Sequence, residues 1–174
     1  DFYKLAQNSL ADTNDAYYEY LEAEIVSLHL AAINLDGIIS AGVAVSRVEE
    51  EIKKTGIEFS GDLWFRLNYL LTNALRTAQS YKLSEDIIVQ RYHLLKRMLS
   101  HHLGRGDARL EIDAALATRA MGEYFNDVKY IDEAATVFQK VLKQASDIED
   151  FDNMARMTHN LAEVYDFRAR ISRK

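Results

Sequence analysis

Apolar residues recur three and four positions apart along most of this chain, with polar residues between them. Leu67, Leu71 and Leu75, for example, follow one another at steps of four, which places them on one side of a helix. The pattern therefore predicts a series of amphipathic helices. We expect them at about 14–33, 36–55, 107–126, 129–146 and 152–170, with two more inside 62–103.

Short polar side chains stand where several of these helices should begin, because they can accept hydrogen bonds from unpaired first-turn amides. Asp36 is expected to cap the helix over 36–55, and Gly56 to follow its end. Asp62, Asp107 and Asp152 are each expected to open a helix, and their regular spacing indicates a helical repeat. An up-and-down bundle without a repeat is the alternative.

Composition supports a helical fold. The 174 residues include no proline and only seven glycines, so few positions interrupt a helix. A hydrophobic share of 48% is enough for a packed core, and we expect one domain over residues 1–174. The absence of cysteine excludes disulfides, zinc–thiolate sites and thiol nucleophiles.

Charge and hydropathy limit the partners. The net charge of −6 disfavours general binding to nucleic-acid backbones. No apolar run approaches the roughly 18 residues of a membrane span, so we expect no membrane segment and a cytoplasmic location. Because the chain starts at Asp1 rather than Met, we also expect it to be a fragment of a longer protein.

No residue pattern indicates catalysis. The sequence has no Gly-Xaa-Ser-Xaa-Gly elbow and no phosphate-binding glycine loop. His101 and His102 diverge by about 100° around a helix, which does not suit a metal site. The acidic runs 49–51 and 147–150 are interpreted as solvated. We expect neither enzyme activity nor a cofactor or metal, with an all-helical enzyme as the least favoured alternative.

The stretch 118–142 resembles a tetratricopeptide repeat. Gly122, Phe125, Ala134 and Phe138 stand in the order of that family's small and aromatic positions, and the segment 160–165 repeats the first-helix motif. The resemblance is best over 107–166, loose over 62–103, and limited to architecture over 14–55. It implies an all-α, right-handed solenoid of antiparallel helix pairs, with about seven to eight helices in divergent units at about 14–55, 62–103, 107–146 and 152–170.

Close packing explains the motif. Gly122 and Ala134 are expected where the two helices of one pair cross, since a large side chain there would force them apart. Phe125 and Phe138 are expected to be buried between neighbouring pairs.

The resemblance also implies a groove lined by the first helices of successive pairs. Its mixture of charged and amide groups suits an extended peptide or an acidic partner segment. The alternative is that these are ordinary solvent-facing residues. Carried over by motif position, the groove residues are Arg76, Gln79, Arg119, Glu123, Arg156, His159, Asn160 and Glu163.

We therefore expect a non-catalytic protein- or peptide-binding module, the sensing or scaffolding part of a larger regulatory protein. A structural self-association domain is the alternative. In that case the last helix would form a homodimer, because its apolar residues Met154, Met157, Leu161 and Val164 would need cover.

Overall fold

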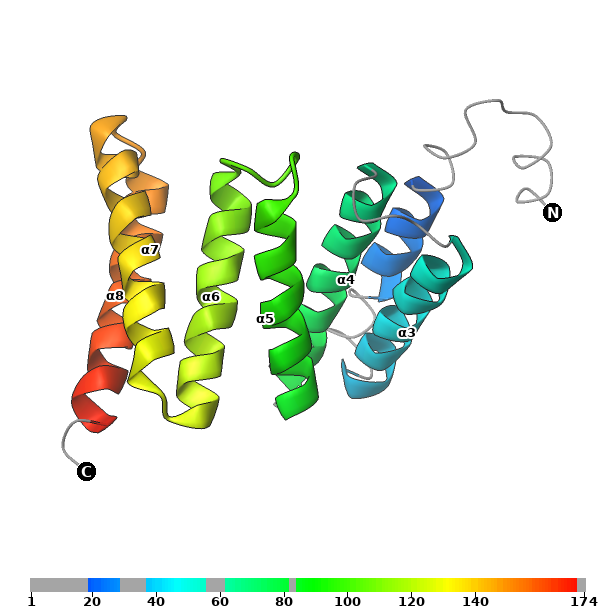
Figure 1. The fold of residues 1–174 in the computed structure, drawn as a ribbon, viewed down its shortest axis with the longest axis horizontal. Helices are drawn as coiled ribbons and strands as arrows, with labels where there is room; N and C mark the ends of the chain where they lie inside the picture. Colours follow the sequence, from blue (N-terminus) through cyan, green and yellow to red (C-terminus); the bar gives the residue numbers. More distant parts are fainter. Residues whose placement is uncertain (1–18, 29–36, 56–61, 82–83, 172–174) are drawn as a thin grey trace. The chain divides into compact units, whose positions relative to one another are not determined.

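The computed structural model describes residues 19–28, 37–55, 62–81 and 84–171 (Figure 1). All regular structure in these ranges is helical, which confirms the all-α prediction. The expected cap at Asp36 and stop at Gly56 lie outside the described residues. Residues 19–28 form one helix. The others are α3 (Gly37–Thr55), α4 (Asp62–Tyr81), α5 (Glu85–Ser100), α6 (Ala108–Phe125), α7 (Val128–Asp147) and α8 (Phe151–Ile171).

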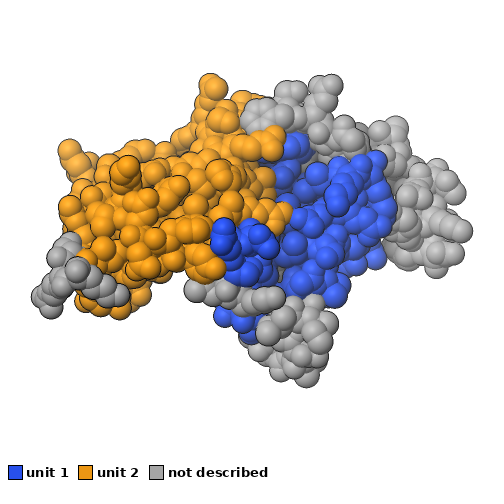
Figure 2. All heavy atoms as spheres, turned by 60° about the horizontal axis from the view of Figure 1, so that its bottom comes forward, with its two compact units in different colours: residues 1–87 blue, residues 88–174 orange. Residues whose placement is uncertain are grey.

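The chain divides into two compact units, residues 1–87 and 88–174 (Figure 2). In the first unit α3 packs against α4, with Ala41 against Ala78. The predicted stripe on α4 is buried, since Leu67, Leu71 and Leu75 are each at most 5% exposed. Apolar residues four apart thus form the inner side of α4, as the sequence pattern predicts.

In the second unit α7 packs against both α6 and α8. Phe138 of α7 is fully buried at the centre of the larger core cluster, with Ile131 before it and Met157 of α8 beside it. A smaller cluster joins Ile88 of α5 to Met121 of α6. Both α6 and α8 therefore pack against α7.

Short turns with capping aspartates precede α6 and α7. Gly106 precedes α6 with a φ of +80°, a conformation that a side chain would disfavour. Asp107 then caps α6, because its Oδ1 accepts hydrogen bonds from the Arg109 and Leu110 amides at 2.8 and 3.2 Å. Asp127 caps α7 in the same way, accepting from the Lys129 amide at 2.9 Å.

The prediction that Asp152 opens the last helix is wrong by two residues. Asp152 lies inside the first turn of α8, and Asp150 accepts from the Asn153 amide at 3.1 Å and from its side-chain Nδ2 at 2.6 Å. These hydrogen bonds to the ionised form lower the pKa of Asp150 below its ordinary value of 3.8. The α7–α8 turn is short, so the cap comes earlier than a strict repeat of the aspartates implies.

The expected burial of Phe125 is also wrong, because its side chain is 42% exposed. Phe125 is the last residue of α6, and its ring stacks edge-on with the neighbouring Tyr124 instead of entering the core. Gly122 and Ala134, by contrast, are buried as expected.

The apolar side of α8 is covered within the chain. Met157, Leu161 and Val164 are buried against α7, and Met154 is half-buried. The observation that motivated a homodimer through this helix therefore does not hold, since these side chains find their cover on α7.

Candidate binding face on α6 and α8

The eight predicted groove residues lie on three helices. Arg76 and Gln79 are on α4 in the first unit, where Arg76 is exposed and Gln79 half-buried. The other six lie on α6 and α8 in the second unit. The site described below lies entirely within that second unit.

Four of these six residues form one connected charge cluster, which we call the pairing face: Arg119, Glu123, His159 and Glu163. An Arg119 guanidinium nitrogen donates to Glu163 Oε2, joining α6 to α8 directly. Arg119 Nε also lies 3.3 Å from Glu123 Oε1, one turn further along α6. On α8, His159 Nε2 is 3.6 Å from the other oxygen of Glu163. The sequence alone predicts these positions but not that they are in contact.

Burial differs across the pairing face. The Arg119 side chain is only 20% exposed, whereas Glu123 and Glu163 are 38% and 45% exposed. Arg119 Nε makes no hydrogen bond of good geometry, so its contact with Glu123 is electrostatic. Two carboxylates thus surround one guanidinium, and with His159 neutral the face carries one excess negative charge. The accessible atoms are mainly carboxylate oxygens.

Arg156 and Asn160 flank this cluster on α8. Arg156 is exposed, and its guanidinium lies 3.5 Å from Asn153 Oδ1 within the same helix. Asn160 is half-buried, one position after His159. An amide at such a site can both donate to and accept from a peptide backbone.

Ala120 and Leu116 of α6 also stand at groove positions of the repeat family, but they do not belong to the pairing face. Ala120 is 9% exposed and packs with Ile88 and Met121. Leu116 packs against the core cluster around Phe138. Both side chains pack in the core and help to fix the position of α6. The pairing face therefore includes fewer α6 residues than the family's groove positions would suggest.

His101 and His102 lie next to each other in the turn after α5. His101 is buried, and its Nδ1 accepts from the Leu103 amide at 3.3 Å as α5 ends. The ring of His102 lies 4.3 Å from that of His101. Among the described residues no group of three or more His, Asp or Glu side chains could hold a metal ion.

One acidic run is not simply solvated, contrary to the sequence-based interpretation. Glu51 is only 5% exposed and forms ion pairs with Arg47 and Lys54 on α3, and Arg47 also lies 3.2 Å from Glu24. Pairing with Glu50, and then with Glu51, raises the pKa of Lys54. Arg47 and Glu51 are four residues apart, a spacing that brings two side chains together on a helix, so the sequence could have indicated this ion pair.

None of the helices in the described ranges is long and apolar enough to cross a membrane. Comparison of the chain with known protein families, curated proteins and solved structures finds no match.

Proposed function

We propose that the chain is a non-catalytic peptide-binding module, and that its helices stack in antiparallel pairs in the manner of divergent tetratricopeptide repeats. In such an arrangement α6 and α8 are the first helices of successive pairs. The packing of both helices against α7 supports this reading. The role would be sensing or scaffolding in a larger regulatory protein.

The observation that carries the proposal is the contact between Arg119 on α6 and Glu163 on α8. It joins two helices whose facing residues are polar, although both helices bury apolar residues elsewhere. Polar residues brought together from two helices, with an amide at Asn160 beside them, offer both charge and backbone hydrogen bonding. An extended peptide needs both.

The charge of the pairing face also indicates the charge of the peptide that it would bind. The cation at Arg119 is already neutralised by Glu123 and Glu163, so an acidic segment would meet repulsion there. A peptide with a lysine or arginine would instead pair with the more exposed carboxylates. We therefore favour a basic extended peptide over the acidic segment suggested by the sequence.

A displayed library of random peptides, selected against the 174-residue chain, tests this proposal. Selected peptides should be rich in Lys and Arg. Fluorescence polarisation with one selected peptide should show about tenfold weaker binding to Glu163→Gln or Asn160→Ala, the fold-change expected for loss of a charge-assisted or well-placed hydrogen bond. Lys143→Ala, an exposed change on α7, is the matched control.

A charge swap separates binding from stability. The double variant Arg119→Glu with Glu163→Arg keeps an ion pair between α6 and α8 while exchanging its direction. It should stay folded, with a somewhat lower denaturant midpoint because the new glutamate at position 119 faces Glu123 on α6. The folded variant should bind the selected peptide more weakly. Selection of only acidic peptides, or binding unaffected by all these variants, would refute the assignment of the face.

A further inference from the structure

A pocket of about 330 Å³ lies in the second unit, against residues 111–118 of α6. Its floor is formed by the buried Ala114, Ala115 and Thr118, and its walls by α5, the α5–α6 turn and α7. This volume lies within the range of small-molecule sites. None of the four pairing-face residues lines the pocket, so it is separate from the proposed peptide site.

Three cations from three different elements line this pocket. They are Lys96 of α5, Arg105 of the turn and Lys140 of α7, and the one acid among the lining residues is Glu111. The lining residues therefore carry two excess positive charges, one of which is balanced by Glu133, the partner of Lys96. The chain as a whole has a net charge of −6. Such a local reversal of sign attracts anions.

The sequence around the pocket is basic as well. Residues 88–110 contain five Lys and Arg residues and a single acid, Asp107. The carboxylate of Asp107 accepts hydrogen bonds from the amides at the start of α6 and does not line the pocket.

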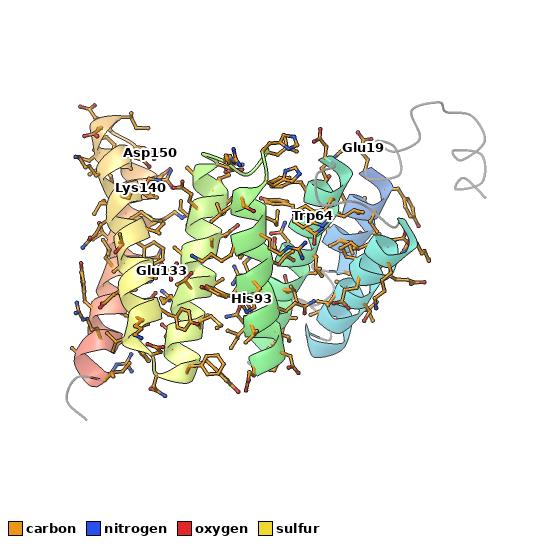
Figure 3. All side chains as sticks on the ribbon, viewed as in Figure 1. Glu19, Trp64, His93, Glu133, Lys140 and Asp150 are labelled. Atoms are coloured by element: carbon orange, nitrogen blue, oxygen red, sulfur yellow. The ribbon has the colours of Figure 1, made fainter. Side chains whose placement is uncertain are left out.

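One of the side chains that line the pocket is itself a carboxylate, that of Glu111. Lys140 Nζ lies 2.7 and 2.9 Å from the two oxygens of Glu111. Lys96 Nζ donates to Glu133, which lies two turns before Lys140 on α7 (Figure 3). Both lysines are between one third and just over one half exposed, so these are weak pairs that a better-placed anion can replace.

The pocket also has an apolar part. Leu99 and Val137 stand in its walls, and the two floor alanines add only methyl groups. A ligand that fits both parts has an anionic head and a compact apolar body. A guanidinium such as that of Arg105 can bind two oxygens of a carboxylate or phosphate at once.

We propose that this pocket binds a small organic anion, with its carboxylate or phosphate group between Arg105 and Lys140 and its apolar part against Leu99 and Val137. The anion displaces the Glu111 carboxylate from Lys140. The site would give the module a small-molecule effector in addition to its peptide.

Calorimetric and amide-shift titrations with phenyl phosphate and benzoate test this inference. Phenol and benzyl alcohol serve as uncharged matches, and inorganic phosphate as the head group alone. At least one of the two aromatic anions should bind, and more tightly than its uncharged match and than inorganic phosphate. Binding of phenyl phosphate alone assigns a phosphate ligand, and binding of benzoate alone assigns a carboxylate ligand.

Charge-reversing variants identify the site. Arg105→Glu and Lys140→Glu should each weaken binding by about tenfold or more, because each removes one charge-assisted contact and adds repulsion. Arg109→Glu and Lys143→Glu make the same charge change on exposed residues that do not line the pocket. Absence of anion binding, equal binding of the uncharged matches, or equal effects of lining and control variants would each overturn the proposal.

Discussion

Gly122 of α6 lies directly against Ile131 of α7. A Cβ atom on Gly122 would come within 2.6 Å of Ile131 Cδ1 and 3.0 Å of the Ile131 backbone nitrogen. Ile131 is itself fully buried, so neither its side chain nor its backbone has room to retreat. This contact sets how closely α6 and α7 approach.

Gly122→Ala should therefore destabilise the second unit. Overpacking costs about 1–3 kcal/mol, and the gain in helix propensity of about 1 kcal/mol offsets only part of it. Gly42, in the interior of α3, has nothing within 4 Å of an added Cβ. Gly42→Ala should thus raise the free energy of unfolding by about 0.5–1 kcal/mol. Urea unfolding of both variants measures the difference, and a stabilised Gly122→Ala protein would contradict the packing argument.

The two phenylalanines of the repeat-like motif should differ sharply in their contribution to stability. Phe138 is fully buried, so Phe138→Ala should cost about 3–5 kcal/mol. Phe125 is 42% exposed, so Phe125→Ala should cost less than about 1 kcal/mol. Both lie in the second unit and can be compared in one chemical denaturation experiment. Equal costs would show that Phe125 is covered in solution.

Asp107 should contribute more to stability than Asp152, although both were expected from the sequence to begin a helix. Asp107→Ala leaves two first-turn amides of α6 without their acceptor and should cost about 1 kcal/mol. Asp152 caps no amide of α8, because Asp150 occupies that position. Asp152→Ala should therefore be the milder substitution in thermal or urea unfolding. The reverse order would contradict the assigned caps.

Asp150 should make stability depend on acid pH. Its folded-state pKa is lowered, first by the hydrogen bond from the Asn153 amide, so its stabilising contribution is present above its ordinary pKa of 3.8. That contribution is lost as the pH falls through the lower folded-state pKa. The stability difference between the wild type and Asp150→Asn should accordingly be largest near neutral pH and shrink below pH 3.8.

Urea titrations at a series of pH values measure that difference. Asp147→Asn, on an exposed carboxylate at the end of α7, is the matched charge control. A difference that grows as the solution becomes more acidic would reverse the sign of the linkage and reject the cap.

Local patterns along the chain specify most of the helices of this protein. The spacing of apolar residues and the polar residues at helix starts act within a few positions along the chain, so the bounds of α6 and α7 and the cap at Asp107 could be predicted closely. The burial of Phe138 and the close packing at Gly122 were instead expected from the resemblance to the repeat family, which also predicted burial for the exposed Phe125.

Contacts between residues on different helices depend on long-range packing. The contact of Arg119 with Glu163, the exposure of Phe125 and the cover of Met157 by α7 depend on how helices far apart in sequence pack. The pocket lined by Arg105 and Lys140 likewise requires three separate elements to come together. Periodicity along one helix specifies its inner side, but the neighbour that covers that side is set by long-range packing.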